Sequence, residues 1–145
     1  MESSDRHVTT WEHRQAELWD RIFQVTQDVI ALADTLESSS GAAHVQQELV
    51  TTAMKVGQEL VRANAADTAQ EFHHHLKEAR LKAIETDYWL RLTYVIQQRE
   101  EVQRDLSSII TQYTSIVDLL HKFAQHTAQE RDVIQKHTKG PRVTG

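Results

Sequence analysis

Three consecutive histidines, His73, His74 and His75, stand near the middle of the chain in a long stretch that contains no Gly or Pro. Histidine is the commonest metal ligand in proteins and carries protons near neutral pH. Adjacent residues of a helix point about 100° apart, so the three imidazoles of one helix cannot converge on a single metal ion. A metal site here would need ligands from other segments, and otherwise the three are surface histidines.

Two carboxylate–histidine pairs with helical spacing, Glu71 with His74 and Asp118 with His121, could supply such ligands. Di-metal helical bundles use two Glu-x-x-His pairs and one Glu from each remaining helix, all facing the core. Glu71 lies beside the apolar stripe that contains Phe72 and Leu76, however, and not on it. The second pair begins with Asp instead of Glu. A di-metal enzyme therefore stays open as an alternative, and we expect surface histidines, no metal and no cofactor.

Other catalytic signatures are missing from the sequence. No nucleophile with a base and an orienting group, no phosphate-binding loop and no paired carboxylates stand out. The chain has no Cys, which excludes disulfides, cysteine zinc sites and thiol chemistry. We therefore expect a protein that is not an enzyme and that has no small-molecule substrate.

Basic side chains form a stripe in the segment that follows residue 67. Viewed down a helix, four of them fall within about 80° to 140° of Phe72; they are His73, Lys77, Arg80 and Arg91. Such a stripe can hold phosphates, with an affinity that falls steeply as salt is added. Acidic residues of the same segment could instead pair with the cations and leave a solvated face; they are Glu78, Glu85 and Asp87.

Charge is uneven along the chain, whose net charge is −5. Residues 121–145 hold five Lys or Arg against Glu130 and Asp132, a balance of +3, so the other 120 residues carry −8. A basic tail on an acidic body points to contact with a polyanion, with Lys136, Lys139 and Arg142 as candidates. A solvated terminus is the alternative interpretation.

Composition predicts an all-α fold, because good helix formers abound and the 145 residues include four Gly and one Pro. We predict helices over about 10–37, 43–64, 68–96 and 99–125 or beyond. The boundary signals are a Thr9–Glu12 capping box, the break at residues 38–41, an Asp67–Gln70 cap and the polar run at 97–101. Four such helices with short connections predict an antiparallel up-down-up-down bundle over residues 10–125. Residues 1–9 are expected to be flexible, and 126–145 to be helical at first and then disordered.

The third predicted helix carries apolar side chains on two sides. Phe72, Leu76, Ala79, Ala83 and Leu90 make an ordinary core stripe, and a second set lies on the opposite side. A helix with one core face needs no second one, so we expect a second neighbour there, such as another subunit. The residues assigned to this contact or to helix packing are Leu81, Tyr88, Trp89, Leu92 and Val95. Trp89 could also stack on a nucleic-acid base.

No run of the sequence approaches the roughly 18 apolar residues of a membrane span. The first ten residues have no apolar stretch of the kind found in a secretory signal. We therefore expect a cytoplasmic protein that has no membrane partner.

A resemblance to a known family rests on two stretches of the sequence. They are ETDYWLRL at residues 85–92 and, before it, VGQELVRANAADTAQEF at residues 56–72. Residues 45–92 resemble the small four-helix-bundle proteins of 23S ribosomal RNA intervening sequences, which are similar to the accessory variability determinant of diversity-generating retroelements. The resemblance implies a homopentameric ring and a non-catalytic accessory role with a reverse transcriptase and its RNA. The chain departs from the family pattern at Glu59, at Val61-Arg62 and at Thr51-Thr52. The resemblance therefore implies no role for those positions.

Overall fold

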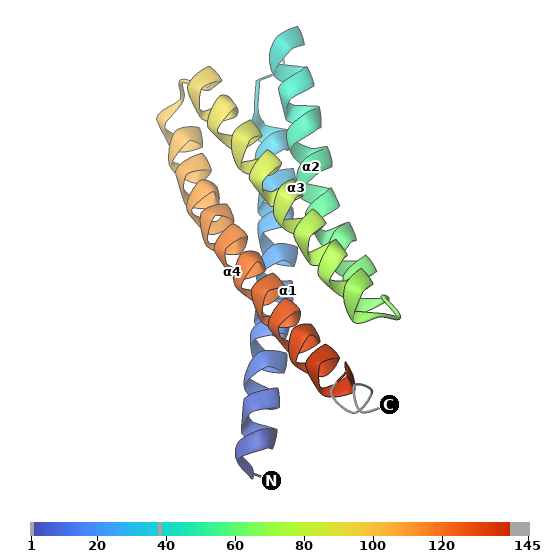
Figure 1. The fold of residues 1–145 in the computed structure, drawn as a ribbon. Helices are drawn as coiled ribbons and strands as arrows, with labels where there is room; N and C mark the ends of the chain where they lie inside the picture. Colours follow the sequence, from blue (N-terminus) through green and yellow to red (C-terminus); the bar gives the residue numbers. More distant parts are fainter. Residues whose placement is uncertain (1, 38, 140–145) are drawn as a thin grey trace.

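The computed structural model describes residues 2–37 and 39–139, with side chains at residues 13–37, 39 and 41–126. Four helices account for nearly all of this part of the chain: α1 (Glu2–Thr35), α2 (Ser40–Asn64), α3 (Ala69–Ile96) and α4 (Glu100–Lys139). The connections from α1 to α2 and from α3 to α4 lie at one end, and that from α2 to α3 lies at the other (Figure 1). The described residues thus form an all-helical four-helix fold without strands, as the composition predicts.

Each helix packs against two others, because α1 and α3 both lie between α2 and α4. The two diagonal pairs, α1 with α3 and α2 with α4, are not neighbours. The core that fills the centre comes from one stripe of each helix, and fully buried members include Val25, Val29, Leu49, Val56, Ala79, Ala83, Leu90, Leu106, Ile116 and Leu120. The predicted core stripe of α3 therefore faces the core, where Leu76, Ala79, Ala83 and Leu90 are buried.

The start of α1 differs from the sequence expectation. The helix begins at Glu2 instead of near Thr10, so the Thr9–Glu12 pattern lies inside it and residues 2–9 are helical. The sequence before Thr10 contains no Gly or Pro that would end a helix. At the other terminus α4 continues to Lys139, and residues 140–145, including Arg142, lie outside the described part.

Side chains cap the helices at the breaks between α1, α2 and α3. Ser39 is the N-cap of α2, where its hydroxyl accepts a hydrogen bond from Ala42 N at 3.3 Å. The α3 cap lies one residue beyond the predicted Asp67, because the Thr68 hydroxyl accepts from Glu71 N at 3.1 Å. Glu71 returns the interaction by accepting from Asp67 N at 3.3 Å, close to a capping box.

The turn between α3 and α4 forms without Gly or Pro. Gln97 ends α3 in an extended conformation with φ −84° and ψ 125°, and α4 begins three residues later. The side chain of Gln103 donates to Gln97 O at 2.7 Å and to Tyr94 O at 3.2 Å, so it satisfies carbonyls that the end of the helix leaves open. Arg99 donates to Thr35 O at 2.8 Å and ties the turn to the end of α1.

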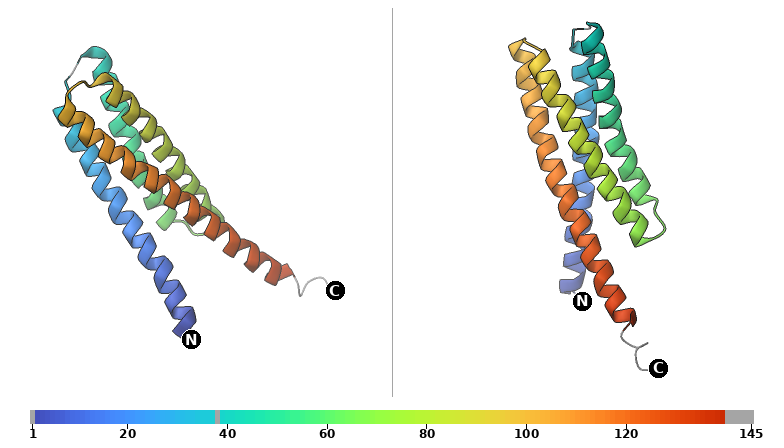
Figure 2. Two further views of the ribbon diagram at one scale, coloured as in Figure 1. Left: turned by 90° about the vertical axis from the view of Figure 1, so that its left-hand side faces the viewer. Right: turned by 45° about the horizontal axis from the view of Figure 1, so that its top comes forward.

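The ends of α1 and α4 project beyond the connection between α2 and α3 (Figures 1 and 2). This follows from length, because α4 has 40 residues and α3 has 28, or about 60 Å against about 42 Å at 1.5 Å per residue. No described helix combines the length and the apolar character that crossing a membrane requires.

Candidate functional surface

The helix α3 presents two apolar faces, and only the inner one is buried. Leu76, Ala79, Ala83 and Leu90 are buried together with Thr86 and Thr93. The two threonine hydroxyls donate to the carbonyls four residues earlier, both at 2.7 Å, which satisfies them inside the core. The outer face carries large exposed apolar side chains; we call them the α3 ridge, and they are Leu81, Ile84, Tyr88 and Val95.

Exposure along the α3 ridge is high for side chains of this kind. Tyr88 is 60% exposed and Val95 74%, and each would lose much of that surface against a partner. Leu92, also assigned to this contact, is half-buried. The predicted second apolar face is therefore present on the described chain, and no described helix covers it.

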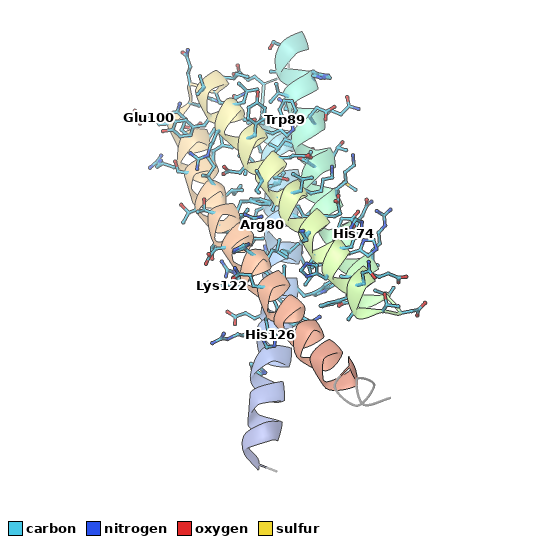
Figure 3. All side chains as sticks on the ribbon, in the orientation of Figure 1. His74, Arg80, Trp89, Glu100, Lys122 and His126 are labelled. Carbon is cyan, nitrogen blue, oxygen red and sulfur yellow. The ribbon has the colours of Figure 1, made fainter. Side chains whose placement is uncertain are left out.

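Trp89 lies on the side of α3 that faces α2 (Figure 3). It is half-buried and packs against the core, and its ring meets that of Tyr88 edge-on with centroids 5.2 Å apart. Of the two uses considered for Trp89, the structure therefore shows helix packing.

The basic stripe runs along the edge of α3 on the α4 side, where Figure 3 places Arg80. Lys77 and Arg91 are exposed, whereas His73 and Arg80 are half-buried. Arg91 Nε lies 2.8 Å from Asp87 Oδ2, and Arg80 Nε has no hydrogen-bond partner among the described residues. Glu85 pairs instead with Lys82, a cation outside the stripe, at 3.2 Å. Within the stripe, Arg91 therefore forms an ion pair inside α3.

The predicted basic tail is only partly described. Lys136 and Lys139 lie in the last turns of α4, beyond the region whose side chains are described. Arg142 falls outside the described residues altogether. The structure therefore does not place these three candidates beside the basic stripe.

The three histidines point in different directions, as the helix geometry requires. His75 meets α2, where its Nδ1 lies 2.8 Å from Glu59 Oε2. His74 is exposed, and its ring contacts that of His75 with centroids 5.1 Å apart. His73 lies half-buried on the opposite side from His75. His75 thus joins α3 to α2.

Glu59 is a buried carboxylate held by two partners. Arg62 Nη1 lies 2.6 Å from its Oε1, and His75 holds its other oxygen. Burial alone would raise the pKa of Glu59, but the hydrogen bonds from His75 and Arg62 outweigh it and lower the pKa below 4.5. Sequence reasoning missed this cluster; its signal was a charged residue between the core positions Val56 and Ala63.

The four residues of the di-metal alternative do not face the core. Glu71, His74, Asp118 and His121 are all exposed. Glu71 caps α3, and Asp118 lies 3.0 Å from Lys122 Nζ. Within the described part of the chain no three His, Asp or Glu side chains come together as metal ligands would. The structure therefore does not bring these four residues together.

A second apolar surface, which the sequence did not reveal, lies between α1 and α2. It is a groove of about 360 Å³ with Gly57 among its lining residues. The large apolar residues that line it and remain exposed are Phe23, Ile30, Met54 and Val61. Their signal was a pair of apolar residues seven apart on each helix, next to the core stripe. We call this surface the α1–α2 groove.

Comparison with known proteins supports the fold. No protein-family model matches the sequence, and no curated protein matches it. One similar solved structure is a protein of unknown function from the S23 ribosomal protein family of Bacteroides thetaiotaomicron. The TM-score is 0.68 at 20% sequence identity, over 77% of this chain and 97% of that one. This chain therefore shares the fold of a member of that family.

Proposed function

We propose that this chain is a non-catalytic, homo-oligomeric accessory protein that binds RNA. The observation that carries the proposal is the outer surface of α3, where the exposed ridge and the cations Lys77, Arg80 and Arg91 share one helix. Apolar area suits a protein contact, and a row of cations suits phosphates. One helix thus offers the chemistry for assembly and for a polyanion.

The resemblance of residues 85–92 to the intervening-sequence proteins extends the proposal. We infer that the helices form an antiparallel bundle, that five copies close a ring, and that the ring works in the cytoplasm with a reverse transcriptase and its RNA. The fold shared with the S23 family protein is consistent with this assignment. Four residues of this motif have contacts within the bundle: Glu85 and Asp87 pair with cations of α3, Thr86 donates to a backbone carbonyl, and Leu90 is buried. Tyr88 and Arg91 are the exposed members of the motif.

RNA binding is tested by neutralising the stripe. The variant carries Lys77→Gln, Arg80→Gln and Arg91→Gln, and its matched control carries Lys55→Gln, Arg104→Gln and Lys122→Gln at exposed positions elsewhere. Fluorescence anisotropy with a single-stranded RNA is measured between about 50 and 200 mM salt. Loss of three phosphate contacts should make the slope of log affinity against log salt shallower by about two, at about 0.7 per contact. The control should bind like the parent.

The outcome that refutes this proposal is no RNA binding by the parent chain at low salt. Equal weakening of both triple variants would also contradict it, because the response would then come from net charge alone. Light scattering and thermal melting of each variant measure whether assembly and folding are preserved, because Lys77 and Arg91 lie beside the α3 ridge. These measurements separate a lost contact from a damaged bundle.

A protein-only scaffold is the second candidate, and the α1–α2 groove favours it. The groove is apolar, and Asp20 and Asp34 are exposed beside its wall residues Phe23 and Ile30, so it repels rather than attracts RNA. If the parent fails to bind RNA but assembles, this candidate replaces the first one.

A further inference from the structure

Two large apolar surfaces of the described chain lack a partner, and they lie on different sides of the bundle. The α3 ridge belongs to a helix that does not neighbour α1, whereas α1 forms one wall of the α1–α2 groove. One copy therefore cannot bring its own ridge to its own groove without unfolding. Two such surfaces on different sides of one molecule can be covered together only by other copies or by two separate partners.

The shapes of the two surfaces differ in a way that suits each to the other. The ridge is a row of side chains projecting from a single helix, with Tyr88 at its centre. The groove lies between two helices, and at Gly57 an added Cβ atom would meet nothing within 4 Å. The groove therefore has free space where α2 lacks a side chain, and a helix with a projecting row of apolar groups can fill it.

The charges beside the two surfaces are opposite. On α1, Asp20 is exposed one turn from Phe23, and Asp34 one turn from Ile30. On α3, Lys77 is exposed one turn from Leu81, and Arg91, which also pairs with Asp87, lies one turn from Tyr88. Acidic groups beside the groove and basic groups beside the ridge attract each other, and they disfavour pairing of like with like.

We propose that the α3 ridge of one copy docks into the α1–α2 groove of the next. The contact is heterologous, since it joins two different surfaces, and repeated contacts of this kind build a ring when the rotation closes. The inference rests on the homo-oligomer in the proposed function and specifies its two contact surfaces. It does not depend on RNA, and it assigns to α1 and α2 a role that the sequence did not indicate.

Two single substitutions test the pairing. Gly57→Glu places a carboxylate in the groove at a position with free space, and Tyr88→Glu places one on the exposed ridge. Gly57→Ala and Tyr88→Phe are the matched controls. In RNA-free buffer, light scattering should show the parent and both controls as oligomers and each Glu variant as a monomer. Circular dichroism and thermal melting check that both Glu variants fold.

Mixing the two Glu variants distinguishes this contact from every symmetric one. The groove variant keeps an intact ridge and the ridge variant keeps an intact groove, so an equimolar mixture should form a 1:1 dimer that grows no further. An interface between two ridges predicts instead that Gly57→Glu protein still assembles and that the mixture forms no 1:1 dimer. Either of these results, or a monomeric parent at micromolar concentration, would overturn the proposal. Because RNA is absent, failure here leaves the RNA-binding result unaffected.

Discussion

Glu59 occupies the core-facing side of α2, where a charged group is costly unless it is paired. Its two oxygens take separate partners, Arg62 from the same helix and His75 from α3. The pair with His75 therefore links α2 to α3 through a specific polar contact within a largely apolar interface. This contact accounts for one member of the histidine triplet without any metal chemistry.

Replacement of Glu59 by Gln should lower the free energy of unfolding by about 1–2 kcal/mol at pH 7, because hydrogen bonds to a buried charged group are lost. The folded-state pKa of Glu59 lies below 4.5, so its carboxylate stabilises the fold above that pH. This contribution is lost as the pH falls through the lowered pKa. Urea unfolding of parent and variant should thus differ by a constant amount above about pH 5 and converge in more acidic buffer. An unchanged difference at pH 3 would contradict this reading.

Tyr113 presents the opposite situation on α4. It is fully buried, and the polar group nearest its hydroxyl is that of Thr26, which itself donates to Ile22 O at 2.6 Å. Burial raises the pKa of its phenol, so the hydroxyl stays neutral. The ring, rather than the hydroxyl, should therefore supply its stabilising effect.

Replacing Tyr113 by Phe should change the free energy of unfolding by less than about 1 kcal/mol, since Thr26 keeps its hydrogen bond to Ile22 O when the phenol hydroxyl is removed. Replacing it by Ala should cost about 3–5 kcal/mol, because a large cavity opens in the core. Thermal unfolding monitored by calorimetry compares the two. A loss with Phe as large as that with Ala would show that the hydroxyl has a strong partner.

At the scale of elements, the turn between α3 and α4 is held by side chains instead of a glycine. Gln103 reaches back across the turn to two carbonyls of the α3 end. Gln103→Ala should therefore lower the free energy of unfolding by about 1 kcal/mol. The matched control, Gln98→Ala, removes an exposed side chain of the same turn and should have little effect. Equal stability of all three proteins in urea would contradict the capping role.

Helix positions could be predicted where the sequence carries local signals. Ser39, the caps before α3 and the polar run at 97–101 mark real breaks, because each acts on its own neighbours in the chain. The start of α1 could not be predicted in this way, since a capping pattern such as Thr9–Glu12 also fits inside a continuous helix. Such a pattern is a local preference, which a good helical sequence on both sides overrides.

The candidate surfaces also differ in how far the sequence predicts them: features of one helix could be predicted, and features made by two helices could not. The second apolar face of α3 follows from helical spacing alone, because it belongs to one helix. The contact between Glu59 and His75 and the α1–α2 groove each depend on how two helices are rotated and spaced, which no single-helix pattern specifies. The interpretation of Trp89 also required the structure, since packing and base stacking ask for the same residue type.

At the scale of the whole molecule, the narrow bundle leaves substantial apolar area outside its core. The four helices bury one stripe each, and the ridge and groove remain exposed. In an assembled ring these surfaces would add burial that the single chain lacks. Folding and assembly are then linked, because any partner that binds only the folded state stabilises it by mass action.

The stability of the parent protein should therefore depend on its concentration. This linkage adds about 2.7 kcal/mol to the free energy of unfolding when the free concentration of neighbouring copies rises a hundredfold above the dissociation constant. The melting temperature of the parent should rise by several degrees over that range, while Tyr88→Glu protein should melt at one temperature throughout. Calorimetry on dilution series of both proteins, in buffer without RNA, makes the comparison. If the melting temperature of the parent is also independent of concentration, its folded state is not stabilised by neighbouring copies. The exposed apolar surfaces of α1, α2 and α3 would then need partners other than this chain.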